Sequence, residues 1–323
     1  AKLTGCNTSF MPKAIIASCG TELSKGAQKL HEAMDKDVES EDSIWIIKPS
    51  TANQGTGIVV CRGNELNHLA KTLWEEPLPS VRDSKDEDWS DRLSTDFARR
   101  RYKDPWEPEE KRMKAGDEVV LQEYIMPPML IGKRKFDIRT FCLVASVGPT
   151  LVLRHQELYL RRACEQFNSK ELSKRSAHLT NICVQKHHPR FGEDCVWDLN
   201  RFEKYLSERS NSGLLHEKIL PKIDEVMTTC IRSILPSLSR KRGCFQLLGF
   251  DIFLDSSGAV SLLEVNRNPD LQPHTSRLHR ILSRLVDDTL EVATEVNLRL
   301  KRGEKKLWPL DAETGYNMLI NED

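Results

Sequence analysis

The run Leu-Leu-Gly-Phe-Asp-Ile-Phe-Leu-Asp, from Leu247 to Asp255, decides the fold together with Val-Ser-Leu-Leu-Glu-Val-Asn, from Val260 to Asn266. Both runs are rich in β-branched and large apolar residues, which is typical of strands. The residues between them include Ser256-Ser257-Gly258, a combination that favours a tight turn. The sequence therefore predicts a β-hairpin here.

The two faces of this hairpin differ sharply in chemistry. We expect an even-length loop, so that Leu254 pairs with Ala259 and Ile252 pairs with Ser261. Because side chains alternate between the faces of a strand, one face is predicted to be an apolar core surface. Its members are Leu248, Phe250, Ile252, Leu254, Leu263 and Val265. The other face carries Asp251, Glu264 and Asn266, amid Phe253 and Leu262.

Two carboxylates and an amide oxygen on one half-buried surface predict a cation site. Buried like charges repel one another and lose hydration, which is costly without a counter-charge. Mg²⁺ prefers such an all-oxygen shell, which substrate phosphates can complete. The predicted metal ligands are Asp251, Glu264 and Asn266. The alternative is a solvated outer face with ordinary structural ion pairs.

Length and composition set the broad class. The chain has 323 residues, a formal net charge of +0, 30% charged and 39% hydrophobic residues. Two domains or lobes and an ordinary globular core are expected, and a neutral chain argues against a general nucleic-acid or membrane-surface binder. Nine cysteines without Cys-x-x-Cys spacing favour reduced thiols in a cytoplasmic protein. No apolar run reaches transmembrane length, and a start at Ala1 without Met indicates a fragment.

A loop between two strands indicates an anion site. Residues 43–48 read as a buried strand, residues 49–57 as a loop with Gly55 and Gly57, and residues 58–61 as the returning strand. Glycine lets backbone N–H groups approach phosphate oxygens closely, although a plain hairpin turn would look the same. The loop matches neither a Walker nor a Rossmann pattern. Lys48 ends the incoming strand among apolar residues, where an ammonium needs an anion.

Charged residues on a second strand pair point to substrate binding. On a strand, Lys135, Asp137 and Arg139 share one face, and Arg161 ends the strand that follows. Several cations and one carboxylate suit a substrate that carries both carboxylate and phosphate groups. The alternative is a charged sheet surface that faces solvent. The nearby run from His178 to Asn181 offers an imidazole, a hydroxyl and an amide, and we assign no acid–base role to His178.

The remaining elements predict a mixed α+β fold rather than a doubly wound one, because strands and helices alternate without a βαβ repeat. The predicted strands are Glu118 to Tyr124 and an antiparallel pair, Arg134 to Val147 with Thr150 to Leu160. The predicted helices are Glu22 to Val38, Asn64 to Trp74, Leu214 to Leu235 and Thr275 to Arg302. The charge-dense stretch from Pro77 to Gly116 is predicted to be a surface insertion.

Six ordered motifs over about 220 residues resemble the tubulin–tyrosine ligase-like family, whose fold belongs to the ATP-grasp group. The motifs are Trp45-Ile-Ile-Lys-Pro-Ser50 with Gly55-Thr-Gly57, Leu121-Gln-Glu-Tyr124, Arg134-Lys-Phe-Asp-Ile-Arg139, His178-Leu-Thr-Asn181, Phe245-Gln-Leu-Leu-Gly-Phe-Asp251 and Leu263-Glu-Val-Asn266. The resemblance implies two lobes of mixed and antiparallel sheet with packed helices. Residues 1–125 would form a central ATP-grasp lobe containing the insertion, and residues 126–323 a C-terminal lobe with the metal hairpin and the last helix.

The resemblance also implies a role for each site residue. ATP phosphates would be held by Lys48, Gly55, Gly57 and Lys135. The adenine would be bordered by Gln122, Glu123, Tyr124 and Ile125. The amino-acid and acyl-phosphate site would be lined by Asp137, Arg139, Arg161 and Thr180. Mg²⁺ would be held by Asp251, Glu264 and Asn266, in agreement with the hairpin pattern.

The implied reaction is ATP-dependent ligation of a free amino acid to a carboxylate of an acidic protein tail, with tubulin as the expected acceptor. ATP would activate the carboxylate as an acyl phosphate, which the incoming amine attacks. Arg267 beside the site favours glutamate as the donor. The alternatives are a tyrosine or glycine ligase, or a tubulin-binding pseudo-ligase without activity. A monomer in the cytoplasm at microtubules or cilia is expected, with no nucleic-acid or membrane partner.

Four features depart from the family pattern. The family's N-terminal lobe is largely missing, Asn53-Gln54 stands where the loop often carries a basic residue, and the insertion at residues 77–116 has no counterpart. After Asn266 the chain reads Arg-Asn-Pro-Asp, unlike the tyrosine-adding member. Against these, Lys48, Lys135, Asp251 and Glu264 are all present, which favours an enzyme.

Overall fold

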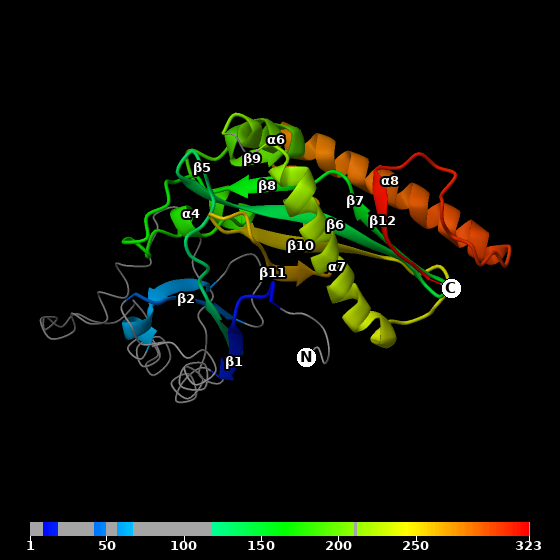
Figure 1. The fold of residues 1–323 in the computed structure, drawn as a ribbon, viewed down its shortest axis with the longest axis horizontal. Helices are drawn as coiled ribbons and strands as arrows, with labels where there is room; N and C mark the ends of the chain where they lie inside the picture. Colours follow the sequence, from blue (N-terminus) through cyan, green and yellow to red (C-terminus); the bar gives the residue numbers. More distant parts are fainter. Residues whose placement is uncertain (1–8, 19–41, 50–56, 67–117, 210–211, 323) are drawn as a thin grey trace, which may run out of the picture.

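The computed structural model describes residues 9–18, 42–49, 57–66, 118–209 and 212–322, and it contains two antiparallel sheets (Figure 1). The smaller sheet is built from the chain before residue 124 and the larger one from the chain after residue 129. The predicted mixed α+β class is confirmed, whereas the division into two lobes stays a prediction. The expected helix at residues 22–38 and the insertion at residues 77–116 lie outside the described residues.

The smaller sheet has four strands in the order β1-β4-β2-β3. Its strands are β1 (Ala14–Ser18), β2 (Ile44–Pro49), β3 (Val59–Arg62) and β4 (Glu118–Glu123). The predicted strands at residues 43–48, 58–61 and 118–124 are therefore confirmed. A 3-10 turn, η1 (Gly63–Glu65), follows β3, and the rest of the predicted helix from residue 67 lies beyond the described part.

The larger sheet is built around β6, a strand of 14 residues. Its main order is β11-β10-β6-β7-β12, with β5 and β8 also paired to β6 and β9 paired to β8. The strands are β5 (Leu130–Ile131), β6 (Arg134–Val147), β7 (Thr150–His155), β8 (Tyr159–Arg162), β9 (Val196–Asp198), β10 (Gln246–Leu254), β11 (Val260–Asn266) and β12 (Tyr316–Glu322). Thus β6 lies beside β10 and β8, which carry Asp251 and Arg161, while β11 with Glu264 and Asn266 lies beyond β10.

Two long helices cover opposite faces of this sheet: α7 (Leu220–Ile234) and α8 (Ser276–Lys301) (Figure 1). Even-numbered β6 side chains such as Phe136 and Ile138 pack in the core beneath α7. Odd-numbered ones such as Phe141 and Leu143 pack in the core beneath α8. The first half of β6 differs, because its odd positions are charged. The site therefore lies on the α8 face of the sheet, on the half of β6 where charge replaces the apolar core.

The residues at the starts of the two long helices explain where these helices begin. Thr275 caps α8 by accepting a hydrogen bond from the Leu278 amide at 3.1 Å, as the expected start required. The predicted helix from Leu214 is interrupted: a π-helical stretch, η3 (Leu214–Ile219), precedes α7. Pro221 then sits in the first turn of α7, where its missing N–H costs nothing. No helix in the described ranges is long and apolar enough to cross a lipid bilayer.

The shorter helices and turns connect strands of the larger sheet. They are α4 (Arg175–His178), α5 (Ile182–Gln185), η2 (Glu193–Cys195), α6 (Leu199–Ser207) and η4 (Leu235–Ser237). Tyr124 at the end of β4 packs with Leu179 and Val60 in a small apolar cluster. This cluster joins the smaller sheet to the loop that carries α4 and α5.

The predicted hairpin forms, but its predicted register is wrong. Leu254 pairs with Val260 and Ile252 pairs with Leu262, one residue away from the expected partners. Leu262 and Val260 therefore belong to the core, while Val265 is exposed. A bulge between Asp251 and Ile252 then shifts the pairing again. The bulge places Asp251 opposite Glu264, so the predicted sharing of one face by the two carboxylates is confirmed.

The predicted single strand from Thr150 to Leu160 is also wrong. It breaks after β7, and β8 pairs with the first half of β6 while β7 pairs with the second half. The break lets both short strands use the same long strand. It also brings Arg161 directly opposite Asp137, which one uninterrupted strand would not do.

Candidate functional site

Four neighbouring strands bring the predicted site residues into register. Asp251 on β10 pairs with Arg139 on β6, and Asp137 on β6 pairs with Arg161 on β8. On the far side of β10, Asp251 also pairs with Glu264 on β11. Directly opposed residues share a face and lie close together. Five charged side chains from four strands therefore gather on one surface.

The arginines and aspartates form one connected ionic network. Arg139 donates through Nε and Nη2 to the two carboxylate oxygens of Asp251. Arg161 donates through Nε to Asp137 at 2.7 Å, and its Nη2 lies 2.8 Å from Asp251. The Thr180 hydroxyl donates to Asp137 at 2.7 Å. Two guanidiniums and two carboxylates thus balance in charge, with Arg161 as the bridge.

This network is buried, since each of its charged side chains is less than a tenth exposed. Burial alone would raise the pKa of the Asp251 carboxyl, but the guanidiniums of Arg161 and Arg139 outweigh burial and hold that pKa well below its usual range. Asp251 is therefore an anion throughout the physiological pH range. A cation bound by Asp251 would have to share its oxygens with the two arginines.

A second chain of hydrogen bonds leads away from Lys135. Its Nζ donates to the Tyr124 hydroxyl at 2.8 Å and to the His178 carbonyl at 3.0 Å. The Tyr124 hydroxyl lies 3.0 Å from His178 Nδ1, and His178 Nε2 lies 3.1 Å from the Glu171 carbonyl. A carbonyl only accepts, so Nε2 carries the proton and Nδ1 accepts from Tyr124. Burial, together with Lys135, lowers the pKa of His178 to about 4, so the ring is neutral.

Lys135 itself is a buried ammonium that donates its hydrogen bonds to two neutral oxygens. Burial lowers its pKa to about 7, with Asp137 acting in the opposite direction and Lys48 adding to the decrease. Burial also lowers the pKa of Lys48, against the attraction of Glu264 and Asp251. Lys48, which is half-buried, is thus close enough to disfavour the charge of Lys135, and neighbouring ammonium groups favour a bound anion. This observation fits a phosphate group.

Glu264 and Asn266 stand at the rim beside Asp251. Asn266 donates through Nδ2 to Glu264 at 3.0 Å. Loss of hydration on the inner side of Glu264 raises the pKa of its carboxyl, and the neighbouring Asp251 carboxylate raises it further. A divalent cation would relieve this repulsion, and the three oxygen-bearing side chains suit Mg²⁺. Among the described residues, no group of three or more His, Cys, Asp or Glu side chains could hold a metal ion by itself.

The residues expected to border an adenine lie at the end of β4. Gln122 is buried and pairs with Ile46 on β2, while Ile125 is partly exposed beyond the strand. Gly57 has a φ of +70°, and an added Cβ would lie 2.8 Å from Pro49 Cγ, so glycine is required there. The predicted phosphate glycine Gly55 lies outside the described residues. These placements leave the assigned roles as predictions.

Sequence reasoning missed two residues of the site. Tyr159 pairs with Arg139 across β6 and β8 and is buried against the ionic network. The charges of Arg139 and Arg161 favour its ionised form, but burial outweighs them and raises the pKa of its hydroxyl. His178, which was given no acid–base role, orients Tyr124 instead. The sequence signal for His178 was its position two residues before Thr180, in a run that also contains Asn181.

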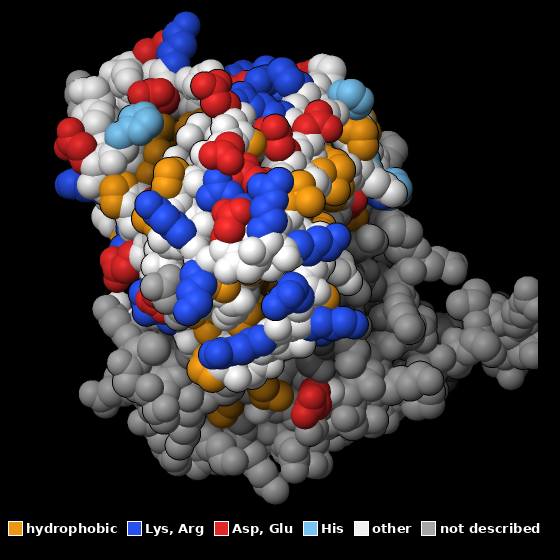
Figure 2. Space-filling model, turned by 90° about the vertical axis from the view of Figure 1, so that its right-hand side faces the viewer, with side chains coloured by type: hydrophobic (Ala, Val, Ile, Leu, Met, Phe, Trp, Pro, Cys, Tyr) orange, Lys and Arg blue, Asp and Glu red, His pale blue; other side chains and the backbone are white. Residues whose placement is uncertain are grey.

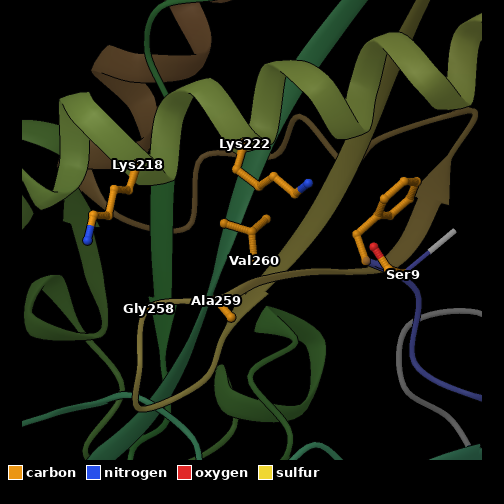
Figure 3. A pocket seen from close by; sticks show the side chains of 7 residues that line it. Ser9, Lys218, Lys222, Gly258, Ala259 and Val260 are labelled. Carbon is orange, nitrogen blue, oxygen red and sulfur yellow. The ribbon is translucent and has the colours of Figure 1, made fainter. Parts of the chain in front are cut away.

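A separate hollow of about 390 Å³ lies between η3, the start of α7 and the hairpin turn (Figure 3). It is lined by Ser9, Phe10, Lys218, Lys222, Gly258, Ala259 and Val260. Val260 belongs to the core beneath α7, on the opposite face from the ionic network. Lys222 is already bonded to Glu225 at 2.7 Å. This hollow is therefore not part of the candidate site.

Comparison with known proteins gives a family and several relatives. The model of the tubulin-tyrosine ligase family matches residues 18–302. Protein polyglycylase TTLL10 of Macaca fascicularis is 30% identical over 87% of this chain and 42% of its own length. The probable tubulin polyglutamylase TTLL9 of Bos taurus is 27% identical over 96% of this chain and 64% of its own length. Inactive polyglycylase TTLL10 of Homo sapiens is 28% identical over 87% of this chain and 39% of its own length. The chain thus spans less than two thirds of each of these relatives.

Proposed function

Since this chain belongs to the tubulin-tyrosine ligase family, we propose that it is an ATP-dependent ligase that joins glutamate to carboxylates of an acidic protein tail, with tubulin as the acceptor. The observation that carries the proposal is that Asp251 faces Glu264 across β10 and β11, while the half-buried ammonium of Lys48 interacts electrostatically with both carboxylates and with the buried Lys135. This set of charges suits a nucleotide phosphate together with Mg²⁺. The protein would work as a monomer in the cytoplasm at microtubules.

In this proposal each residue holds or orients a substrate. Lys48 and Lys135 hold phosphate oxygens, and Asp251, Glu264 and Asn266 hold Mg²⁺, which would neutralise phosphate charge. The hydrogen-bond chain from His178 through Tyr124 directs the Lys135 ammonium. Arg139 and Arg161, held in the ionic network with Asp137 and Asp251, line the site for the amino acid and the acyl phosphate. ATP supplies the leaving group that a carboxylate lacks, in the form of an acyl phosphate.

Glycine is the second candidate donor, because relatives named polyglycylases are at least as identical to this chain as the relative from Bos taurus named a polyglutamylase. A relative named an inactive polyglycylase supports a pseudo-ligase as the third candidate. The presence of Lys48, Lys135, Asp251 and Glu264 in this chain supports activity instead.

The test is incubation of the purified protein with ATP, Mg²⁺, tubulin and one of glutamate, glycine or tyrosine. Intact-mass spectrometry of the tubulin tails reads the added mass, and Glu264→Gln is the control. A glutamate increment that the control loses supports the proposal. A glycine increment would establish the second candidate. No increment with any donor, while the protein still binds the nucleotide, would contradict ligase activity on tubulin.

A further inference from the structure

A strongly basic surface lies at the end of the larger sheet that is away from the turn between β10 and β11. The segment from Leu238 to Phe245 precedes β10 and contains no acidic residue, and the end of α8 continues into a second basic run. Together they expose seven cations, which we call the basic face: Arg240, Lys241, Arg242, Lys301, Arg302, Lys305 and Lys306. Figure 2 shows lysine and arginine side chains gathered on this side of the molecule.

The two parts of the basic face are neighbours in space. A Cβ added at Gly243 would lie 3.4 Å from Oδ1 of Asn297 on α8. Because a helix rises about 1.5 Å per residue, Lys301 lies only ~6 Å further along the helix axis. One carboxylate, Glu304, lies among the seven cations and is 3.8 Å from Arg302. Within the described ranges the other six cations have no ion-pair partner.

Such a concentration of charge is notable in a chain whose formal net charge is +0. Like charges on one surface repel each other, and the resulting field attracts anions. Exposed cations are also common on ordinary protein surfaces, so the position of this face relative to the site matters.

The basic face adjoins the start of β10, the strand that carries Asp251 of the candidate site. Gln246 follows the basic segment and donates through Nε2 to the Arg267 carbonyl at 2.6 Å. Arg267 in turn follows Asn266, and Asp251 is five residues along β10 from Gln246. At about 3.3 Å per strand residue this separation is ~17 Å. An extended peptide covers the same distance with about five residues.

We propose that the basic face is a second binding site for the acidic acceptor tail, on which it holds carboxylates about five or more residues from the one that reacts. This inference rests on the proposed function, and its partner is a polypeptide rich in glutamate or aspartate. Exposed charge pairs are individually weak, but several on one tethered chain add up. The basic face would also speed the encounter between enzyme and tail.

The test compares two fluorescent glutamate-rich peptides, one of about twelve residues and one of about four, since only the longer spans both sites. The variant Lys241→Glu/Arg242→Glu reverses two charges of the basic face. The matched control Lys204→Glu/Lys218→Glu reverses two exposed lysines on α6 and η3. Fluorescence anisotropy at about 50 mM and about 200 mM salt gives the affinities.

We expect the basic-face variant to bind the long peptide about tenfold more weakly at low salt, while its affinity for the short peptide changes less than about twofold. The control variant should bind both peptides like the wild type. Equal losses in the two variants, or equal losses for the two peptides, would overturn the inference. A single-stranded oligonucleotide or phosphatidylserine vesicles that bind better than the long peptide, and only with the basic face intact, would also overturn it.

The tubulin ligation assay separates this inference from the proposed function. Long-peptide binding that depends on the basic face, in a protein that ligates no amino acid, would support the second binding site and contradict the reaction. Ligation by the wild type, together with unchanged peptide binding in the basic-face variant, would support the reaction and contradict the second binding site.

Discussion

Replacing Arg161 by methionine tests whether the ionic network acts as a unit. Arg161 is the bridge between Asp137 and Asp251, at 2.7 Å and 2.8 Å. Without it, Asp137 is a buried carboxylate whose remaining side-chain donor, within the described residues, is the Thr180 hydroxyl. Removing one partner of a buried ion pair costs about 3–5 kcal/mol, because the other charge stays buried. We expect this decrease in the free energy of unfolding.

The reciprocal change, Asp137→Asn, should be milder. Arg161 keeps its ion pair with Asp251, so the loss is about 1.5–3 kcal/mol, typical of a hydrogen bond to a charged group. In the double variant no charge is left isolated at residue 137. Its loss should therefore be smaller than that of Arg161→Met alone, giving a coupling energy of about 3 kcal/mol.

Urea unfolding at pH 7, followed by circular dichroism, measures the four free energies. The matched control cycle is Arg232→Met with Glu322→Gln, an ion pair of 2.6 Å whose two side chains are about half exposed. Its coupling should not exceed about 1 kcal/mol. If the Arg161 and Asp137 losses simply add, within about 0.5 kcal/mol, the network does not act as a unit and the reasoning is refuted.

Three further predictions follow from the same geometry. Lys135, with its pKa lowered to about 7, loses its charge above that pH. Affinity for ATP, measured by calorimetry, should therefore fall about tenfold per pH unit above pH 7, and a profile that Lys135→Met does not flatten would contradict this role. His178 has a folded pKa of about 4 against an ordinary 6.5, so the unfolded chain binds a proton first as the pH falls. Stability should drop by about 2–3 kcal/mol between pH 6.5 and 4, and His178→Gln should reduce that slope in urea titrations. Asp255 accepts through Oδ1 from the amide and hydroxyl of Ser257 in the hairpin turn. Asp255→Ala should cost about 1–2 kcal/mol in the same assay, whereas an unchanged midpoint would show that the turn forms without this carboxylate.

Local pattern was sufficient for the elements that carry the site. Residues Arg134 to Val147 were predicted as a strand and form β6 with the same bounds. The helix predicted from Thr275 starts with Thr275 as its cap. Both signals are local, since alternation sets the faces of a strand and a side-chain oxygen next to the first turn sets a helix start. The common face of Lys135, Asp137 and Arg139 followed from the same alternation.

Contacts between distant segments were beyond the reach of local pattern. The meeting of Lys135 with Tyr124 and His178 joins three segments of the chain, and only the packing of the smaller sheet against the α4–α5 loop sets it. Likewise, alternation within β8 does not say which β6 residue faces Arg161. Register between strands depends on loop length and on which side chains fit the core, and both are properties of the assembled fold.

The sequence by itself determined that Asp251 and Glu264 share a face, that charged and apolar positions alternate along β6, and that the family's motifs occur in order. Only the tertiary structure decided how the two carboxylates meet. Local alternation predicts a continuous hairpin with Ala259 opposite Leu254, whereas the observed pairing is displaced by one residue near the turn and by one more at a bulge before Asp251, which returns Asp251 and Glu264 to one face. The physical reason is that burial of Val260 and Leu262 beneath α7 sets the register near the turn, and the bulge realigns the carboxylates beyond it.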